Sequence, residues 1–437
     1  MIRRTILEWQ HLPYGEAPDQ IPEGAASGLA IAASASSFAG RGGDGVLEHG
    51  RKSLRARGIV GVLATPDAQL EILPKIDAPG ENHTANDSVL RHRLVHMLGV
   101  ALNLRIEEAG IARLGHQSDT LLEILIRLFS ARLLNTVRNG MPRQYMGRSD
   151  DLPALRGRLN TKRQFSVLAT HPERLACDFD ELSADIPLNQ VMKATVTHMS
   201  RLARASDNQR TLRELAFAYA GISDLTLAEL NWDGITLDRT NQRWGDLLSL
   251  AKLLLGSRYQ ATSSGRTGGY ALLFEMNLLF EEYVARILKM ALAGTELRVS
   301  TQGGHRSCLY EGDVGRFRTK PDIIIRRGSE IVMIIDTKWK TMTPKIDDPK
   351  QGVSQGDVYQ LMAYSQLYNC RKTMLLYPHH SGLGNEAERH TYDIAVPDSR
   401  NTLTLSTVDV AAKARLCTIE LGQLVRSSLG GIVPARA

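Results

Sequence analysis

The sequence has few cysteines, and none of them forms a recognisable motif. Cys177, Cys308, Cys370 and Cys417 lie far apart along the chain and include no CxxC pair. This spacing indicates neither a zinc knuckle nor a disulfide framework. The sequence therefore predicts a protein of a reducing compartment, and we expect a cytoplasmic location.

Membrane, secretion and nucleotide-binding signals are also missing. No apolar run is long enough to span a bilayer, and Arg3 and Arg4 are followed too soon by Glu8 and His11 for a secretory leader. No GxxxxGK[ST] loop is present, and the glycine-rich stretch 256–269 has no lysine to meet phosphates, so it is interpreted as a linker. Any nucleotide-driven movement must therefore come from a partner chain.

Length and patterning predict an α+β or α/β protein of several domains. The chain has 437 residues, which exceeds what one ordinary hydrophobic core holds. Residues 1–86 alternate short apolar runs with glycine-rich turns and predict a β-rich N-terminal domain, whereas residues 87–265 show mainly helical periodicity. Residues 266–437 predict a mixed sheet flanked by helices. The formal charge of +6 favours an anionic partner, of which nucleic acid is one example.

The segment from Thr319 to Lys340, TKPDIIIRRGSEIVMIIDTKWK, is the most informative part of the chain. Its apolar runs Ile323–Ile325 and Ile331–Ile335 are separated by residues 327–329, Arg-Gly-Ser, which is turn chemistry at hairpin spacing. We therefore predict two buried strands joined by a three-residue loop.

Two carboxylates and a lysine flank this predicted hairpin. With a three-residue loop, Asp322 faces Ile334, and Asp336 is its diagonal neighbour at roughly 7–8 Å between Cα atoms. Side chains alternate along a strand, so Asp322, Asp336 and Lys338 share one face while Thr337 points the other way. A loop of two residues would break this arrangement, because a one-residue slip moves every side chain to the opposite face.

A buried carboxylate at the end of an apolar strand is costly unless its charge is compensated. Oxygen ligands from one or two carboxylates suit Mg²⁺ (or Mn²⁺), which polarises a phosphodiester and lowers the pKa of a bound water. Lys338 would orient that water or neutralise the developing charge. The pattern predicts a metal-dependent phosphodiesterase, although a Pro-Asp turn and an Asp-x-Lys strand end are also ordinary surface features.

The motif resembles the core of the PD-(D/E)xK nucleases. Pro321, Asp322, Asp336 and Lys338 match the core motif, and Gln360 and Tyr364, four apart on one helical face, match the QxxxY helix of the RecB-like branch. Gln360 and Tyr364 would brace the site or touch a phosphate.

In that superfamily a helix preceding the core often contributes a glutamate, and residues 268–290 are the candidate helix. Glu281 lies on its apolar stripe with Phe274, Leu278, Val284 and Leu288, so it is the third acid that the resemblance implies, as an auxiliary metal ligand or base. An inner acid paired with a buried lysine or arginine is the alternative.

Several further segments resemble the McrC family, the nuclease subunits of McrBC-type modified-cytosine restriction systems. They occur in the family's order: QLEILPKI at 69–76, LRGRLN at 155–160, DELSADIPLNQVMKA at 180–194 and FEMNLLFEEYV at 274–284. The resemblance implies a Mg²⁺-dependent DNA endonuclease that works with McrB, an AAA+ GTPase hexamer recognising DNA with methylated cytosine, and that stimulates its GTPase.

An arginine-rich tract with Tyr145 interleaved lies in the middle region. Its members are Arg132, Arg138, Arg143, Arg148, Arg156, Arg158, Lys162 and Arg163. Such a tract is typical of a DNA backbone contact, but Asp150 and Asp151 interrupt it, and arginine also serves protein interfaces. The sequence leaves a DNA track and a partner-facing surface open.

Three functional hypotheses follow. The first is an endonuclease subunit with Asp322 and Asp336 as metal ligands, Lys338 at the attacking water and Glu281 as the auxiliary acid. The second is an adaptor with a silent nuclease site, whose N-terminal residues 1–86 dock on an AAA+ ring and stimulate its hydrolysis. The third is a stand-alone RecB-like nuclease that needs no partner.

Overall fold

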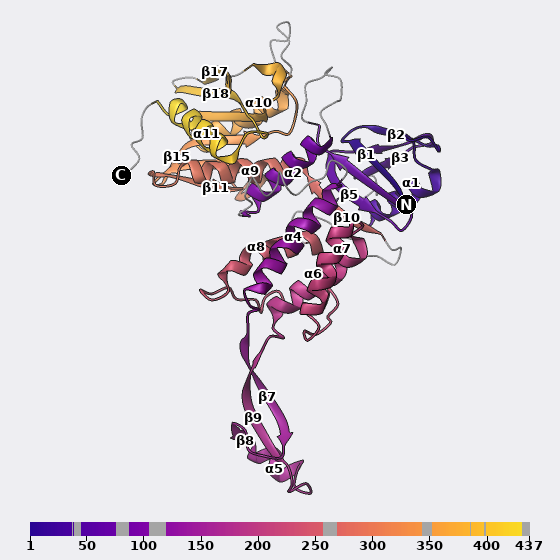
Figure 1. Ribbon diagram of the computed structural model, residues 1–437. Helices are drawn as coiled ribbons and strands as arrows, with labels where there is room; N and C mark the ends of the chain where they lie inside the picture. The colour runs from indigo at the N-terminus through magenta and orange to yellow at the C-terminus, as the bar shows by residue number, and fades with distance from the viewer. Residues whose placement is uncertain are drawn as a thin grey trace. The chain divides into compact units, whose positions relative to one another are not determined.

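The structure is a computed structural model and describes residues 1–36, 38, 45–75, 87–104, 119–256, 269–342, 352–384, 386–396 and 399–430. The chain forms two compact units, one made of Met1–Leu121 with Gly256–Ala437 and one made of Leu122–Leu255. Both contain helices and strands, so the fold is a mixed α/β multidomain one, as the sequence predicts (Figure 1). The linker predicted at 256–269 lies almost wholly outside the described residues.

Two general predictions from composition agree with the structure. All four cysteines are free, and three of them are buried. None of the helices in the described ranges is long and apolar enough to cross a bilayer.

The N-terminal part of the first unit is built on a four-stranded sheet with the order β1-β6-β5-β10. Its strands are β1 (Ile2–Leu7), β5 (Ile59–Ala64), β6 (Ala68–Leu73) and β10 (Tyr270–Glu275). Every residue of β5 and β6 is buried, and in β6 these include Gln69 and Glu71, of which Glu71 is paired with Arg91 at 2.7 Å. A smaller sheet and one helix complete this core: β2 (His11–Pro13), β3 (Leu47–His49), β4 (Ser53–Ala56) and α1 (Glu23–Ser34).

Strand β10 comes from the range 266–437 that was predicted as the nuclease domain, yet it pairs antiparallel with β5 in the N-terminal sheet. Gly61 makes this pairing possible. It has φ +135°, and a Cβ atom there would lie 2.0 Å from the carbonyl oxygen of Leu272. The chain passes directly from β10 into helix α9 (Met276–Ala291), so the N-terminal sheet and the C-terminal part share one continuous segment.

Substitution of Gly61 by alanine is expected to destabilise the first unit by about 2–3 kcal/mol, because the added methyl group meets backbone rather than a flexible side chain. Gly24→Ala is the matched control, since nothing lies within 4 Å of that position in α1. Thermal unfolding should show a lower midpoint for Gly61→Ala alone. Equal midpoints for the two variants would contradict this account of the β5–β10 pairing.

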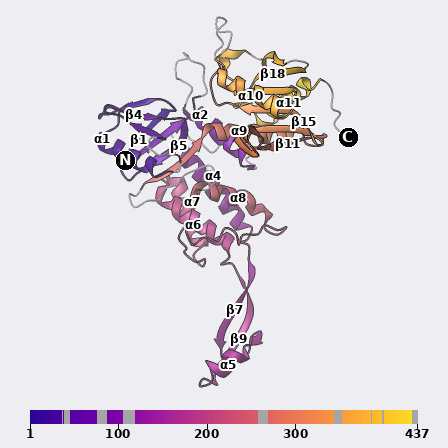
Figure 2. The same cartoon turned by 180° about the vertical axis from the view of Figure 1, so that it is seen from behind.

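The second unit combines a helical body with a β-arm. The body contains α4 (Leu121–Arg138), α6 (Pro187–Leu202), α7 (Ser206–Ala218) and α8 (Gly245–Leu255). The arm contains β7 (Gln144–Leu152), β8 (Arg158–Leu159), α5 (Thr161–Ser166) and β9 (Leu175–Ser183). Figures 1 and 2 show β7 and β9 as a long twisted ribbon that leads away from the helices of this unit. The helices agree with the prediction for the middle region, whereas the arm was not predicted.

The C-terminal part of the first unit is a six-stranded mixed sheet with the order β11-β14-β15-β16-β18-β17. Its strands are β11 (Leu297–Thr301), β14 (Ile323–Arg327), β15 (Glu330–Thr337), β16 (Lys372–Pro378), β17 (Glu388–Val396) and β18 (Ser399–Val408). The adjacent strands β15, β16 and β18 are parallel, and α10 (Gln355–Leu367) connects β15 to β16, as a parallel pair requires. Helix α9 packs on β11 and β15, and α11 (Ala414–Ser428) packs on α9, whereas α2 (Asp87–Ala101) covers another part of α9.

The hairpin loop predicted between β14 and β15 is wrong in length. Arg327 pairs with Glu330, so only Gly328 and Ser329 form the loop, and Gly328 adopts φ +59°. A β-bulge at Val332 then inserts one extra residue into β15, because Arg326 pairs with Ile331 but Ile325 pairs with Met333. The bulge cancels the slip that a two-residue loop would otherwise cause.

The corrected register changes the partner of Asp322. Ile323 pairs with Ile335, so the next step outward sets Asp322 opposite Asp336 rather than opposite Ile334. Directly opposed residues in a sheet share a face. Continued pairing would make the two acids direct neighbours, and the charge of Asp322 does contribute to the raised pKa of Asp336.

Candidate active site

Asp322 and Asp336 meet at the ends of β14 and β15. Asp336 is only 1% exposed and is the penultimate residue of β15. The Oδ2 atom of Asp322 accepts hydrogen bonds from the backbone N–H of Thr337 at 2.8 Å and from its hydroxyl at 3.0 Å. The prediction that Thr337 turns away is therefore wrong for its hydroxyl, because Asp322 precedes β14 and Thr337 ends β15, where strand alternation no longer fixes side-chain direction.

Lys338 completes this group of charges. Its Nζ lies 2.6 Å from Oδ2 of Asp336 and 3.8 Å from Oδ1 of Asp357, and it donates to Oε1 of Gln360 at 3.3 Å. The backbone N–H of Lys338 donates to the carbonyl oxygen of Leu376 at 2.9 Å, which holds the residue against β16. The structure thus brings the predicted acid and lysine together.

The two α10 residues singled out by the sequence extend this network. The amide of Gln360 donates from Nε2 to the hydroxyl of Tyr364 at 2.7 Å, while its Oε1 receives the ammonium of Lys338. A hydrogen-bonded chain therefore runs from Asp336 through Lys338 and Gln360 to Tyr364. The position of Gln360 fixes the direction of the ammonium group.

Glu281 enters from α9 and is 8% exposed. Burial first, and then the nearby charge of Asp322, raise the pKa of Glu281 to about 7. Glu281 forms no ion pair among the described residues, in contrast to the alternative of an acid neutralised by a buried lysine or arginine. Its Oε1 atom is buried without a hydrogen-bond partner in that part of the chain, as is Oδ1 of Asp336.

The other charges of the site are shifted in the same sense. Burial raises the pKa of Asp336 to about 6, with a further contribution from Asp322, and burial also raises the pKa of Asp322. Burial alone would lower the pKa of Lys338, but the carboxylates of Asp336 and Asp357 outweigh it and raise that pKa. Asp322, Asp336 and Glu281 therefore place more buried carboxyl groups near Lys338 than its one ammonium group would neutralise, and a bound cation would compensate the excess.

The donor set fits a hard cation that keeps several waters. Within the described ranges no three His, Cys, Asp or Glu side chains are arranged closely enough to ligate one ion together. Mg²⁺ does not require such a cage, since one or two carboxylates with waters and substrate oxygens suffice. Asp322 and Asp336 are the residues that would hold it, and the unpartnered Oδ1 of Asp336 is the free donor atom.

The shifted pKa of Glu281 predicts a pH-dependent cost in stability. Because the folded-state pKa of about 7 lies above the ordinary 4.5, the folded state is most stable below pH 4.5 and loses stability as pH rises through 7. Glu281→Gln, which cannot ionise, should therefore exceed the wild type by about 3 kcal/mol at pH 8 without divalent metal. Denaturant unfolding at pH 4.5 and pH 8 measures this, and the difference should vanish at the lower pH. A Glu281→Gln variant that is less stable at pH 8 would contradict the assignment.

Two contacts of the site were missed from the sequence. Asp357, on α10, accepts a hydrogen bond from Nζ of Lys340 at 2.9 Å. It precedes Gln360 by three residues and Tyr364 by seven, and this helical spacing could have placed it on the same face of the helix. The indole N–H of Trp339 donates to Oε1 of Glu8 at 2.9 Å, which links the segment after β15 to the end of β1. No local sequence pattern announces a contact between residues so far apart.

Six residues of the arginine-rich tract, those predicted to contact DNA, lie in or beside the β-arm of the second unit. Three of them are paired with acids: Arg148 and Arg156 with Glu181 at 2.9 and 3.6 Å, and Arg163 with Asp151 at 2.8 Å. The other three are exposed and form no ion pair among the described residues: Arg143, Arg158 and Lys162. Two carboxylates, those of Glu181 and Asp151, therefore pair with three of the six cations, so most of the predicted positive charge is left uncompensated by these ion pairs.

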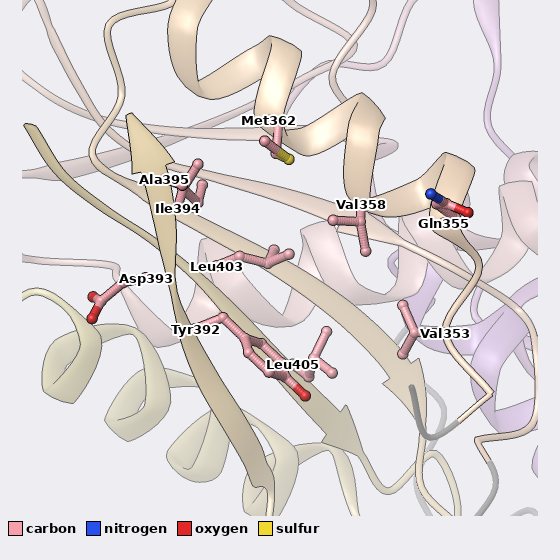
Figure 3. A pocket seen from close by; sticks show the side chains of 10 residues that line it. All are labelled: Val353, Gln355, Val358, Met362, Tyr392, Asp393, Ile394, Ala395, Leu403 and Leu405. Atoms are coloured by element: carbon pink, nitrogen blue, oxygen red, sulfur yellow. The ribbon is translucent and has the colours of Figure 1, made fainter. Parts of the chain in front are cut away.

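A separate apolar pocket of about 370 Å³ lies between α10 and the strands β17 and β18 (Figure 3). Val358, Met362, Leu403 and Leu405 line it, and its few polar groups include Asp393. None of the candidate site residues lines this pocket, so the hydrolytic chemistry does not belong there.

Comparison with known proteins identifies the family. A family model described as McrBC 5-methylcytosine restriction system component matches residues 54–378, which is more than half of the chain. The chain therefore belongs to the McrBC family. The McrBC family match includes all six candidate residues of the site: Glu281, Asp322, Asp336, Lys338, Gln360 and Tyr364.

Individual relatives agree with the McrBC assignment. The chain is 22% identical over 318 residues to the type IV methyl-directed restriction enzyme EcoKMcrBC of Escherichia coli K12, covering 70% of this chain and 85% of that protein. It is also similar to a chain from the tetradecameric assembly of Thermococcus gammatolerans McrB AAA+ hexamers with bound McrC, with a TM-score of 0.72, 20% identity and coverage of 97% and 100%. A second match, to the Thermococcus gammatolerans McrBC complex, has a TM-score of 0.52 and 24% identity and covers 67% and 88%.

Proposed function

We propose that the chain is the Mg²⁺-dependent DNA endonuclease subunit of a GTP-dependent restriction complex directed at DNA with 5-methylcytosine. The observation that carries this proposal is the Asp336–Lys338 pair at 2.6 Å, beside Asp322 and with buried carboxylate oxygens left unpartnered. The hairpin β14–β15, followed by α10 with Gln360 and Tyr364, supports assignment to the PD-(D/E)xK superfamily.

The residues of the site have separate roles in phosphodiester hydrolysis. Bound Mg²⁺ (or Mn²⁺) would polarise the phosphate and supply a water of lowered pKa. Asp322 and Asp336 provide the carboxylate oxygens, and Thr337 fixes the orientation of Asp322. Lys338 remains charged at neutral pH and stabilises the negative charge that develops on the phosphate. Glu281, with a pKa of about 7, is suited to exchange a proton with water near neutral pH.

We also propose that the chain stimulates the GTPase of an AAA+ hexamer related to McrB. It has no nucleotide-binding loop of its own, and its structural relative is bound to McrB AAA+ hexamers. We assign the contact surface to the β-arm, which presents large apolar side chains to solvent: Tyr145, Leu155, Phe165, Val167 and Leu182. A DNA contact of the same arm is the second candidate, favoured by its three unpaired cations. Docking of residues 1–86 stays a prediction.

Cleavage of methylated DNA tests the proposal. We expect a mixture of the chain, an AAA+ GTPase partner, GTP and Mg²⁺ to cut methylated double-stranded DNA but not unmodified DNA. Omission of GTP or of Mg²⁺ should prevent cutting. GTPase stimulation without any cleavage would favour the adaptor function instead. Digestion of DNA by the chain alone without GTP would favour the stand-alone nuclease.

A further inference from the structure

A second hairpin projects from the C-terminal part of the first unit between β11 and β14. Strands β12 (Ser307–Glu311) and β13 (Val314–Arg318) form a two-stranded sheet of their own, which is not paired with the six-stranded sheet. Glu311 pairs with Val314, so Gly312 and Asp313 form a tight turn, with Gly312 at φ +59°. The function proposed above gives this hairpin no role.

Both ends of the hairpin insertion begin at the candidate active site. On one side, the backbone N–H of Gln302 donates to the carbonyl oxygen of Asp322 at 2.9 Å, and the side chain of Gln302 lies close enough to Glu281 to lower the pKa of that carboxyl. On the other side, Arg318 is four residues before Asp322, which places their Cα atoms within about 14 Å. A ligand held at the base of the hairpin therefore lies near the carboxylates.

The base of the hairpin is firmly braced. Thr319 donates to the carbonyl oxygen of Arg306 at 2.8 Å from both its N–H and its hydroxyl. The hydroxyl of Tyr368, at the end of α10, lies 2.7 Å from the hydroxyl of Thr319 and accepts from the N–H of Arg306 at 3.2 Å. The guanidinium of Arg306 stacks on the Tyr368 ring at 5.1 Å. These contacts couple the orientation of the hairpin to the helix that carries Gln360.

Among the described residues, side chains of both strands of the hairpin are left exposed. Four large apolar side chains are more than half exposed: Leu309, Tyr310, Val314 and Phe317 at 58%, 70%, 55% and 74%. An isolated two-stranded ribbon is only marginally stable in water, and clustered exposed apolar groups mark interaction sites. Phe317 also adopts φ +52°, a conformation that bulky residues rarely take outside functional sites.

The two faces of the hairpin differ in chemistry. Leu309 pairs with Arg316 and Ser307 with Arg318, so both arginines lie on one face. Tyr310 pairs with Gly315 and so lies on the other face. Arg316 is bound by Glu311 at 2.9 Å, whereas Arg318 has no ion pair in the described ranges. Cations beside exposed aromatic rings are typical of nucleic-acid binding, because the cations contact phosphates and the rings stack on bases.

We propose that the β12–β13 hairpin grips double-stranded DNA next to the scissile phosphodiester. Its arginine face contacts backbone phosphates, and Phe317 and Tyr310 pack against bases or sugars, in the manner of apolar wedges that enter a groove. This inference rests on the proposed nuclease function, because DNA is the substrate which that site would cut. Charge complementarity and the origin of the hairpin at the carboxylates favour DNA over a protein partner.

The test measures DNA affinity separately from cleavage. Binding of a fluorescently labelled duplex is measured in Ca²⁺ at several salt concentrations. Three forms of the chain are compared: the wild type, the double variant Arg316→Ala/Arg318→Ala and the double variant Tyr310→Ala/Phe317→Ala. The arginine variant should weaken binding roughly tenfold and lower the slope of log affinity against log salt by about 2. The aromatic variant should weaken binding about tenfold with an unchanged slope. Arg213→Ala/Phe217→Ala, exposed positions on α7, should bind as wild type.

Each other outcome points elsewhere. Unchanged DNA affinity of both hairpin variants would overturn the proposal, even if the wild type cuts DNA with its partner. If the hairpin variants lose self-association in sedimentation but keep their DNA affinity, the hairpin is an interface between copies of the chain. If they lose only GTPase stimulation, the hairpin is a contact for the AAA+ ring. Either result overturns the proposal. A wild-type complex that binds DNA through the hairpin but never cuts it would refute the nuclease function and leave the DNA contact standing.

Discussion

Asp336→Asn should lower the rate of DNA cleavage by the assembled complex at least about a thousandfold while leaving GTPase stimulation unchanged. Asp336 is 1% exposed, contacts Lys338 at 2.6 Å and offers the unpartnered Oδ1 as a metal donor. The asparagine retains the shape of the side chain but removes its negative charge, so cation binding is lost. Single-turnover cleavage of a methylated duplex measures the effect.

The stability of the variant separates a chemical defect from a folding defect. Since burial raises the pKa of Asp336 to about 6, the carboxylate that predominates at pH 7 costs the folded state free energy relative to the unfolded state. Asp336→Asn should therefore unfold no earlier than the wild type in the absence of metal. Asp393→Asn, an exposed carboxylate on β17, is the matched control and should cut normally. Cleavage by Asp336→Asn at the wild-type rate would remove Asp336 from the active site.

Truncation of the β-arm should reduce stimulation of the partner GTPase at least tenfold and leave the nuclease site intact. Leu152 pairs directly with Leu175, so residues 153–174 can be replaced by an Asn-Gly turn without changing the register of β7 and β9. The replacement removes Leu155, Phe165 and Val167, whose side chains are 59–79% exposed. Buried apolar and aromatic anchors carry most of the energy of a protein interface. GTP hydrolysis rates and co-sedimentation with the partner measure the loss.

A second variant distinguishes the two candidate roles of the arm. Arg158→Ala/Lys162→Ala removes exposed cations and keeps the apolar side chains. A partner contact predicts full GTPase stimulation by this variant, whereas a DNA track predicts weaker DNA binding with a reduced salt dependence. Full stimulation by the truncated arm would refute the partner assignment.

The difference between prediction and structure is clearest at the hairpin β14–β15. Apolar β-branched residues predict the two strands correctly, because burying them on both faces leaves few alternatives. The loop length was wrong, since a bulge at Val332 has no signal in an apolar run. The two errors in register cancel, so the carboxylates still meet. The face of the sheet on which a residue lies is predicted more reliably than the residue opposite it. The face changes only when the register shifts by an odd number of residues, whereas any shift changes the partner.

The sequence by itself determined the family resemblance, and it predicted the acids and the lysine of the candidate site and the helix with Gln360 and Tyr364. These two predictions depend on spacing within one strand or one helix. Only the tertiary structure decided that β10 joins the N-terminal sheet, that Glu8 receives the indole of Trp339, and that an exposed hairpin begins at the carboxylates. Contacts between distant segments are selected by the packing of the whole core, and polar strands such as β7 leave no apolar period to detect.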